Sequence, residues 1–459
     1  MKTLNLPPMK QYDAIIIGSG QAANPLAKKL AAAGRRTLLL EEAQLGGTCI
    51  NTGCTPTKTM IAVARMQYIA SRAPAFGIPL QAGPVDLTAV IKRKNEIVSS
   101  FRGSLAKSLE KTANLDVIKE QGVFTGHKTV NGQYTAEHIF INTGAQPVIP
   151  PIAGIHDVPY FTSAGMLDLQ EVPEHLVVLG SGYIAMELGQ MYRRFGSQVT
   201  IVERGSRILR REDEDVAGAV RQILEEDGIR IITHTSVQQA APAGNGRVSL
   251  TLENGQVLEA SHWLIATGRA PATRALQLEK TGITPDEQGF IPVNEYLETS
   301  VPGIYALGDV KKGPAFTHIS YNDYIVVAES ILNKKNISIK HRPVPYCMFT
   351  DPELGRIGIT EQEAREKGMA VKIAKLPMSK VARAIETGET RGLIKAVTDA
   401  KTGQILGAAV LSVSGGEIMT VLQMAMMGNI GYKQLRNTIF AHPLFSESLN
   451  NLFMTLDDD

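Results

Sequence analysis

The feature that most constrains the fold of this chain is a glycine turn that follows an apolar run. The run Ala14–Ile17 has the composition of a buried parallel strand, and Gly18-x-Gly20-x-x-Ala23 follows it directly. Gly18 permits the tight turn, Gly20 lets the backbone approach a pyrophosphate, and Ala23 is small enough for the next helix to pack on the strand. Glu41 ends the next apolar run, 23 residues after Gly18, where such units place a carboxylate that binds a ribose hydroxyl.

The same arrangement occurs a second time in the chain. The apolar run 176–179 leads into Gly180-x-Gly182-x-x-Ala185, and Glu203 again stands 23 residues after the first glycine. One match of this kind is a weak signal, but two independent coincidences of strand, turn, helix and acid are improbable. The sequence therefore predicts two dinucleotide sites, each with its phosphates at the positive N-terminal end of a helix.

Each predicted unit also has a closing strand. Residues 141–144 and 264–269 are apolar runs that end in glycine turns, so Thr143, Gly144 and Gly268 are candidate nucleotide contacts. We therefore predict an α/β fold that contains two Rossmann-like nucleotide-binding domains.

Charge and composition exclude several other classes of protein. Lys and Arg number 47 against 45 Asp and Glu, and the net charge of +2 argues against a broad nucleic-acid footprint or a polybasic membrane anchor. No apolar run reaches the roughly 18 residues of a membrane-spanning helix, and residues 1–12 lack the apolar core of a secretory signal. Three cysteines are too few for a secreted disulfide scaffold. We therefore expect a cytoplasmic protein with no nucleic-acid or membrane partner.

Two of the cysteines, Cys49 and Cys54, lie close together just after the first nucleotide unit. Their spacing fits neither a zinc site, which needs four ligands, nor the Cys-x-x-Cys of thioredoxin-like proteins, so we predict no metal site. Four residues between cysteines can form one helical turn that brings the sulfurs close enough to bridge. Cys347 is remote and lies in an apolar segment, where we expect a buried structural thiol.

The residues around the cysteine pair carry a specific signature. Leu45–Lys58 contains the pattern G-G-x-C-x-x-x-x-C-x-P-x-K in full, and with it the chain resembles the FAD-dependent pyridine nucleotide-disulfide oxidoreductases. Thr299–Asp309 is similar to the second flavin motif of that family, and Ala441–Glu447 to its C-terminal histidine–glutamate segment. The resemblance extends from about residue 13 to 453. It implies an enzyme with one FAD per subunit and NADH or NADPH as co-substrate.

The resemblance also implies roles for the cysteines and for one histidine. Cys54 is expected nearer the flavin, as the charge-transfer thiolate, and Cys49 is expected to be the exposed thiolate that attacks the substrate. His442 is similar to the base that serves this thiolate across a homodimer interface, and Glu447 to the residue that orients its second nitrogen. A helix N-terminus and an imidazolium would both lower the pKa of the attacking thiol.

Other implied roles concern the flavin and the coenzyme. Lys58 and Glu187 resemble the ion pair beside the hydride-accepting nitrogen of the flavin, and Tyr183 resembles the aromatic residue that covers the flavin until nicotinamide displaces it. The motifs imply two sets of contacts: Gly18, Gly20, Ala23, Glu41, Gly47, Thr48, Lys58, Thr143, Gly144, Gly308 and Asp309 for FAD, and Gly180, Gly182, Tyr183, Ala185, Glu203, Arg204, Arg210 and Gly268 for NAD(P).

The same resemblance divides the chain into four domains. These are residues 1–144 (FAD-binding, with the cysteine pair), 145–272 (NAD(P)-binding), 273–340 (central, completing the FAD site) and 341–459 (an α+β dimerisation domain). In the last domain, the Met-rich segment Gly415–Met427 is expected to form a buried or interface helix.

The choice of coenzyme stays open at this point. Glu203 should bond a ribose 2′-hydroxyl and repel a 2′-phosphate, which favours NADH. Arg204 and Arg210 match positions that bind the phosphate in NADPH-using members of the family. The interpretation is therefore NAD(P)H.

Comparison within the family narrows the choice of electron acceptor. Asn51–Lys58 and His442–Phe453 resemble the mercuric reductase-like branch, which includes flavoproteins of reactive-chlorine resistance, although the C-terminal cysteine pair of mercuric reductases is absent. The arginines typical of glutathione reductases are missing from 21–34 and 311–336. The branch points to a metal ion, an oxidant or a small disulfide as the acceptor. Dihydrolipoyl dehydrogenase, which usually has an aliphatic residue in place of Tyr183, is retained as an alternative, and a flavin-bound redox sensor as an alternative of another class.

Overall fold

The computed structural model describes residues 9–456 of the chain. They form two compact units, each assembled from discontinuous segments: one from residues up to Thr59 with Ala89–Val148 and Gly268–Arg342, the other from Met60–Thr88, Ile149–Thr267 and the residues from Pro343 onward. The four-domain division predicted from the sequence is finer than this and stays a prediction.

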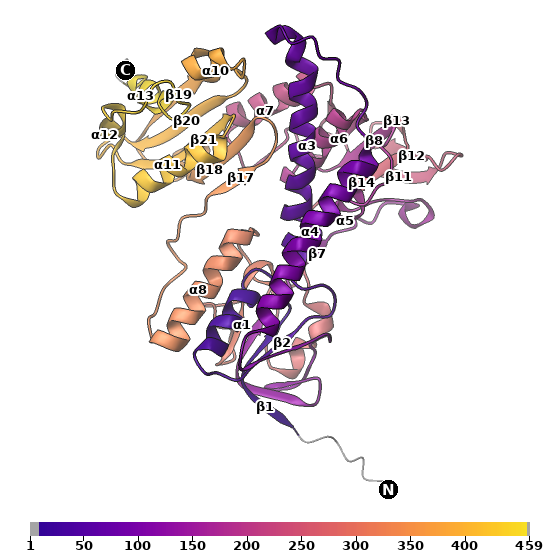
Figure 1. The fold of residues 1–459 in the computed structure, drawn as a ribbon, viewed down its shortest axis with the longest axis vertical. Coiled ribbons are helices and arrows are strands. Elements are labelled where there is room, and N and C mark those ends of the chain that lie inside the picture. Colours follow the sequence, from indigo (N-terminus) through magenta and orange to yellow (C-terminus); the bar gives the residue numbers. More distant parts are fainter. Residues whose placement is uncertain (1–8, 457–459) are drawn as a thin grey trace. The chain divides into compact units, whose positions relative to one another are not determined.

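The first unit is built on a mainly parallel sheet with the strand order β3-β2-β1-β6-β5-β4, to which β16 adds beside β6. Figure 1 labels β1, β2, α1 and α8 in this unit. Ile15 and Ile16, near the C-terminal end of β1, are fully buried in two different core clusters. The strands are β1 (Lys10–Ile17), β2 (Thr37–Leu40), β3 (Leu115–Ile118), β6 (Tyr134–Ile141) and β16 (Ile304–Ala306), with an antiparallel edge of β4 (Phe124–Gly126) and β5 (Thr129–Val130). The buried parallel strand predicted before the first glycine turn is confirmed.

The helices of this unit carry the segments that the sequence singled out. α1 (Ala23–Ala32) begins at the first glycine turn and shares a hydrophobic core with α8 (Thr317–Asn333). The segment after β2 forms α2 (Gly47–Asn51), the start of α3 (Cys54–Arg72) and most of α4 (Leu87–Glu110), while the part of α3 from Met60 onward belongs to the second unit. A short antiparallel pair joins β7 (Ala145–Pro147) to β15 (Arg269–Pro271), and the turn Gly308–Val310 (η5) follows β16.

The second unit contains a nucleotide-type sheet of four parallel strands in the order β10-β9-β8-β14. Its core surrounds Trp263, which is fully buried. The elements are β8 (His175–Leu179), β9 (Gln198–Val202), β10 (Arg230–Ile232) and β14 (His262–Ile265), the helices α5 (Ser163–Met166), α6 (Tyr183–Phe195) and α7 (Glu214–Glu226), and an antiparallel sheet of β11 (Val237–Pro242), β12 (Val248–Leu252) and β13 (Val257–Ala260).

The C-terminal part of the second unit is an antiparallel sheet with the order β17-β18-β21-β20-β19. Its strands are β17 (Tyr346–Met348), β18 (Glu353–Gly358), β19 (Val371–Pro377), β20 (Leu393–Asp399) and β21 (Ile405–Ser412), with helices α9 (Glu361–Glu366), α10 (Ala382–Glu386), α11 (Gly415–Met427), α12 (Tyr432–Arg436) and α13 (Ser448–Met454). The predicted α+β character of this region is confirmed.

Two predictions in this region are refined by the structure. The Met-rich segment is the helix α11, in which Met419 is buried while Met424 and Met427 are exposed. Cys347 lies on β17 and is half-buried rather than buried, because β17 is the edge strand of its sheet. Among the helices within residues 9–456, none is long and apolar enough to cross a membrane.

Candidate active site

The cysteine pair lies at a break between two helices. Cys49 is in the short α2, and Cys54 is the first residue of α3. Thr52, with φ −140°, leaves helical geometry, and a Cβ atom on Gly53 would come within 2.8 Å of the carbonyl oxygen of Thr48. The prediction of a single helical turn between the cysteines is therefore wrong. The first helix ends at Asn51, and the chain bends at Thr52 and Gly53 before α3 begins at Cys54.

Both cysteines are thiols in this structure, and their side chains hydrogen-bond to each other. That bond, followed by burial, raises the pKa of the Cys49 thiol above its usual range. A hydrogen bond with Thr317 and the charge of Lys58 lower the same pKa, but by less. In this dithiol form the neighbouring sulfur and burial disfavour the Cys49 thiolate. The lowering of the thiol pKa expected from an imidazolium across the dimer interface stays a prediction.

Sequence reasoning missed Thr317. Its hydroxyl oxygen lies 3.2 Å from Sγ of Cys54 and also hydrogen-bonds to Cys49. Thr317 is the first residue of α8 and stands 263 positions beyond Cys54 in the chain. A threonine at the start of a helix is common, so the sequence holds no signal that connects it with the thiols.

The exposure of the two cysteines differs from the order implied by the resemblance. Cys54 is exposed and Cys49 is half-buried. The implied roles describe access to the sulfurs in the protein with its flavin bound, and they stay predictions.

The first glycine turn has the geometry that a dinucleotide unit requires. Gly18 has φ +90°, and a Cβ atom there would lie 2.6 Å from the carbonyl oxygen of Asn142. Glu41 accepts hydrogen bonds on one carboxylate oxygen from the Ser19 amide at 2.8 Å and the Ser19 hydroxyl at 2.6 Å. Its other oxygen accepts from the Ala43 amide at 2.8 Å. Each carboxylate oxygen has two lone pairs, so Glu41 can also accept from a ribose hydroxyl.

Asn142 is a second residue that the sequence did not indicate, although it directly precedes the predicted Thr143–Gly144 turn. Its side-chain oxygen accepts from the Ala23 amide at 3.2 Å, and its side-chain nitrogen donates to the Leu307 carbonyl at 2.8 Å. A Cβ atom on Gly20 would come within 2.6 Å of the same side-chain oxygen. Asn142 therefore joins the start of α1 to the strand end that leads into Gly308 and Asp309.

The residues at this strand end fit a flavin nucleotide. Asp309 is half-buried, and burial raises its pKa against the lowering charges of Arg269 and Lys311. A partly desolvated carboxyl group gains most from hydroxyl donors, which the ribityl chain of FAD carries. Gly144 has φ +72°, and a Cβ atom there would meet nothing within 4 Å, which leaves room beside the turn.

The second glycine turn repeats these features. Gly180 has φ +103°, and a Cβ atom there would lie 2.5 Å from the Ala266 carbonyl oxygen. Glu203 accepts from the Ser181 hydroxyl at 2.5 Å and from the Gly205 amide at 2.6 Å. A Cβ atom on Gly182 would meet nothing within 4 Å, so the start of α6 has open space for a phosphate.

The remaining nucleotide residues of the second unit surround this turn. Tyr183 is the first residue of α6 and 38% exposed. Arg204 and Arg210 are exposed, and the Arg210 side chain lies 3.1 Å from the Cβ position of Gly205. An arginine therefore lies beside the carboxylate of Glu203. The site thus holds one group that favours NADH and one that favours NADPH, and the choice of coenzyme stays open.

Glu187 is buried near the middle of α6, with 3% of its surface exposed. One of its carboxylate oxygens accepts a hydrogen bond from the Phe349 amide at 2.9 Å. Lys58 belongs to the first unit and Glu187 to the second, so their predicted pairing stays a prediction.

His442 and Glu447 lie together as predicted. Nδ1 of His442 is 3.0 Å from each carboxylate oxygen of Glu447, and 68% of the histidine side chain is exposed. This contact orients the ring and leaves its other nitrogen available for proton transfer. Ile439, three residues before the histidine, is 97% exposed.

The predicted site residues fall into two groups, one in each unit. The first unit holds Gly18, Gly20, Ala23, Glu41, Gly47, Thr48, Cys49, Cys54, Lys58, Thr143, Gly144, Gly268, Gly308 and Asp309; the second holds Gly180, Gly182, Tyr183, Ala185, Glu187, Glu203, Arg204, Arg210, His442 and Glu447. Gly268, predicted to contact NAD(P), lies in the same unit as the FAD turn. Within residues 9–456, no three His, Cys, Asp or Glu side chains form a group that could hold a metal ion.

Comparison with family models gives two matches. A model described as pyridine nucleotide-disulphide oxidoreductase matches residues 12–323. A model of the dimerisation domain of these enzymes matches residues 344–453, which implies a homodimer.

Three characterised or named proteins are similar over nearly the whole chain. The probable pyridine nucleotide-disulfide oxidoreductase RclA of Escherichia coli is 41% identical over 456 residues, covering 97% of this chain and 99% of that protein. The mercuric reductase of Staphylococcus aureus is 36% identical and covers 98% of this chain and 83% of the relative. The dihydrolipoyl dehydrogenase of Thermus scotoductus is 36% identical and covers 96% of each.

The structural likeness agrees with the sequence likeness. The solved Cu(II) complex of E. coli RclA, described as an HOCl-induced flavoprotein disulfide reductase, matches with a TM-score of 0.90 and 39% identity, covering 98% of this chain and 100% of that chain.

Proposed function

This chain belongs to the pyridine nucleotide-disulfide oxidoreductase family, and we propose that its Cys49–Cys54 pair delivers the electrons of NAD(P)H to a soft metal ion. The observation that carries this proposal is the contact between the two thiols at the α2–α3 break, with Thr317 bonded to both. Two adjacent sulfurs are favourable ligands for a soft metal ion, which here is the substrate. The likeness to mercuric reductase and to an RclA solved with Cu(II) supports the same class of acceptor.

The proposed reaction balances in two stages. NAD(P)H and one proton convert the Cys49–Cys54 disulfide into two thiols and release NAD(P)⁺. The two thiols then give two electrons to the acceptor, both to one Hg(II) or one to each of two Cu(II), lose two protons and re-form the disulfide. Bound FAD supplies the group that accepts hydride and passes the electron pair to the disulfide.

We assign the other residues by the motifs that they match. Lys58 and Glu187 would form the ion pair beside the hydride-accepting edge of the flavin, and Tyr183 would cover the flavin until nicotinamide displaces it. His442 of the partner subunit, oriented by its Glu447, withdraws the proton from Cys49. This last assignment is supported by the exposed His442 ring, whose Nδ1 lies 3.0 Å from each carboxylate oxygen of Glu447. The glycine turns, Glu41 and Asp309 hold FAD, and Glu203, Arg204 and Arg210 contact the NAD(P) ribose.

The direct test is anaerobic oxidation of NADPH and of NADH by the purified flavoprotein, with Hg(II), Cu(II), hydrogen peroxide and glutathione disulfide offered separately as acceptors. We expect metal-dependent oxidation that is lost in Cys49→Ser and in Cys54→Ser. Cys347→Ser is the matched control, because it also removes one thiol from the chain but leaves the pair intact. If only peroxide or only glutathione disulfide supports oxidation of the coenzyme, that compound and not a metal ion is the acceptor.

Two other outcomes separate the alternatives. Rapid reduction of NAD⁺ by dihydrolipoamide would favour dihydrolipoyl dehydrogenase, to which the chain is also similar. A flavin that NAD(P)H reduces without any turnover of acceptors would favour a redox sensor. A cytoplasmic location and the absence of nucleic-acid and membrane partners remain part of the proposal.

A further inference from the structure

We propose that Asp351 and Arg194 are positioning residues for Glu187, and that they act by fixing the backbone of residues 349–351. The inference rests on the proposed function, in which Glu187 acts at the hydride-accepting edge of the flavin. It concerns the second unit alone and adds to the mechanism two residues that no motif in the sequence indicates.

One face of α6 hydrogen-bonds to two residues, Phe349 and Asp351, of the segment before β18. Glu187, Gln190 and Arg194 are spaced three and then four positions apart, which places them on one side of a helix. Glu187 accepts from the Phe349 amide at 2.9 Å. Gln190 accepts from the Asp351 amide at 2.8 Å and donates to the Asp351 carbonyl at 2.9 Å. Arg194 donates to the carboxylate and to the carbonyl of Asp351.

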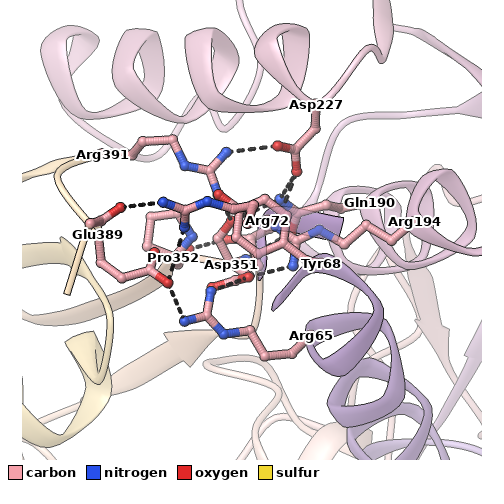
Figure 2. Close-up of polar contacts among 12 residues, drawn as sticks. Arg65, Tyr68, Arg72, Gln190, Arg194, Asp227, Asp351, Pro352, Glu389 and Arg391 are labelled. Atoms are coloured by element: carbon pink, nitrogen blue, oxygen red, sulfur yellow. Dashed lines mark hydrogen bonds and ion pairs between the residues drawn. The ribbon is translucent and has the colours of Figure 1, made fainter. Parts of the chain in front are cut away.

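The carboxylate of Asp351 is the centre of this arrangement (Figure 2). Besides Arg194, it accepts from Nη1 of Arg65 at 2.7 Å on each oxygen. Burial raises the pKa of Asp351, but the charges of Arg194 and Arg65 outweigh burial and hold it below its usual range. Asp351 is therefore charged at neutral pH and keeps both guanidinium groups in place.

Further contacts hold these arginines. Arg194 also pairs with Asp227 at 3.2 Å, and Arg391 bridges Asp227 at 2.7 Å to the Asp351 carbonyl at 3.2 Å. Arg65 pairs with Glu389 at 2.6 Å. Arg65, Arg194 and Arg391 together form an arginine cluster. This cluster connects α3, α6, the end of α7 and the turn before β20 (Figure 2).

The ring of Tyr68 supports the same arginines from α3. The guanidinium carbon of Arg194 lies 4.1 Å from the ring centroid, that of Arg391 4.9 Å and that of Arg72 5.1 Å. Stacking of guanidinium groups on one ring restricts their rotation. Arg194 has 6% of its side chain exposed, so water cannot replace its partners without cost.

The consequence for Glu187 follows from its burial. Its carboxylate is almost fully enclosed, and the Phe349 amide fixes the direction of one oxygen. The position of that amide depends on Asp351, two residues along the chain, which Gln190 and Arg194 hold on the same helix face as Glu187. A change at Asp351 therefore reaches Glu187 through two peptide units and turns its carboxylate.

The test is a double-mutant cycle between Asp351→Asn and Glu187→Gln, measured as the rate of flavin reduction by NAD(P)H after rapid mixing. We expect Asp351→Asn to slow flavin reduction about tenfold when Glu187 is present. In the Glu187→Gln background the same substitution should change the rate by less than about twofold, since the group through which it acts has been removed. FAD content and thermal stability are measured for each variant.

Glu389→Gln is the matched control. Glu389 pairs with Arg65 and Arg72 of α3 in the same cluster rather than with a residue of α6, so its substitution should leave the rate of flavin reduction unchanged. If Asp351→Asn does not fold, Arg194→Lys takes its place, because it keeps the charge and loses the forked contact.

Two results would overturn the inference: an equal slowing by Asp351→Asn in both backgrounds, or an equal slowing by Glu389→Gln. A wild-type flavin that NAD(P)H does not reduce would instead contradict the proposed function, and the inference with it.

Discussion

The Ser181 hydroxyl donates a hydrogen bond to the Glu203 carboxylate at 2.5 Å, just as the Ser19 hydroxyl donates one to Glu41 at 2.6 Å in the other nucleotide unit. In both units the acid at the end of the second strand is tied to the serine between the two glycines. The second acid is therefore held in a fixed orientation before a coenzyme arrives. Its fixed charge is the basis of the first prediction.

Glu203→Ala should shift the coenzyme preference toward NADPH. The substitution removes a buried carboxylate that repels a 2′-phosphate, and it leaves Arg204 and Arg210 exposed beside the site. Loss of one ribose hydrogen bond, worth about 1 kcal/mol, corresponds to a change of about fivefold in the ratio of kcat/KM for NADPH to that for NADH. Steady-state kinetics with both coenzymes measure the ratio. An unchanged ratio in Glu203→Ala would show that Glu203 does not contact the ribose.

The nucleotide units were predictable because their signals are local. Gly18 and Glu41 belong to one strand–helix–strand unit. The backbone of Gly18 has a positive φ, which favours glycine, so the residue type itself predicts the turn. Thr317 and Asp351 left no such signal. Thr317 meets Cys54 across 263 positions of the chain and Asp351 meets Arg65 across 286, so only the folded chain reveals their roles.

Thr317→Val should make Cys49 a weaker nucleophile. The hydrogen bond with Thr317 lowers the pKa of Cys49, so its loss moves that pKa further up and reduces the thiolate fraction at any pH below it. A hydrogen bond of about 1 kcal/mol predicts alkylation of Cys49 about fivefold slower at fixed pH. Iodoacetamide labelling of the reduced protein, followed by mass spectrometry of the Cys49 peptide, gives the rate. Thr317→Ser keeps the hydroxyl and should react like the wild type; equal rates for the Val and Ser variants would refute the role.

His442→Ala should lower kcat by about 10²-fold or more, the contribution usual for a positioned acid–base group. If His442 serves the partner's Cys49, a heterodimer of one His442→Ala and one Cys49→Ser subunit has one site with both defects and one intact site. Mixing the two inactive variants under conditions that exchange subunits should then restore activity, to about half per heterodimer. No recovery, despite heterodimers seen by native mass spectrometry, would place His442 and Cys49 of the same chain together.

Asp351→Asn should destabilise the protein, and the loss should depend on pH. Removing this charge leaves Arg194 with Asp227 as its ion-pair partner and Arg65 with Glu389, and breaking a buried pair of this kind costs about 3 kcal/mol. Because the charges of Arg194 and Arg65 overcome burial and depress the pKa of Asp351, the stabilisation is full above the unfolded value of about 4. It is lost as the pH falls through the lower folded value.

The difference between the wild type and Asp351→Asn should therefore be largest near neutrality and shrink as the pH falls below about 4. Urea denaturation midpoints, measured by circular dichroism across that range, follow the difference. Asp157→Asn, at an exposed aspartate of the same unit, is the matched control and should change the midpoint little at any pH. A constant difference between wild type and Asp351→Asn from neutral to acid pH would show that the carboxylate charge is not what holds Arg194 and Arg65, since a charge-based contribution must vanish once Asp351 is protonated.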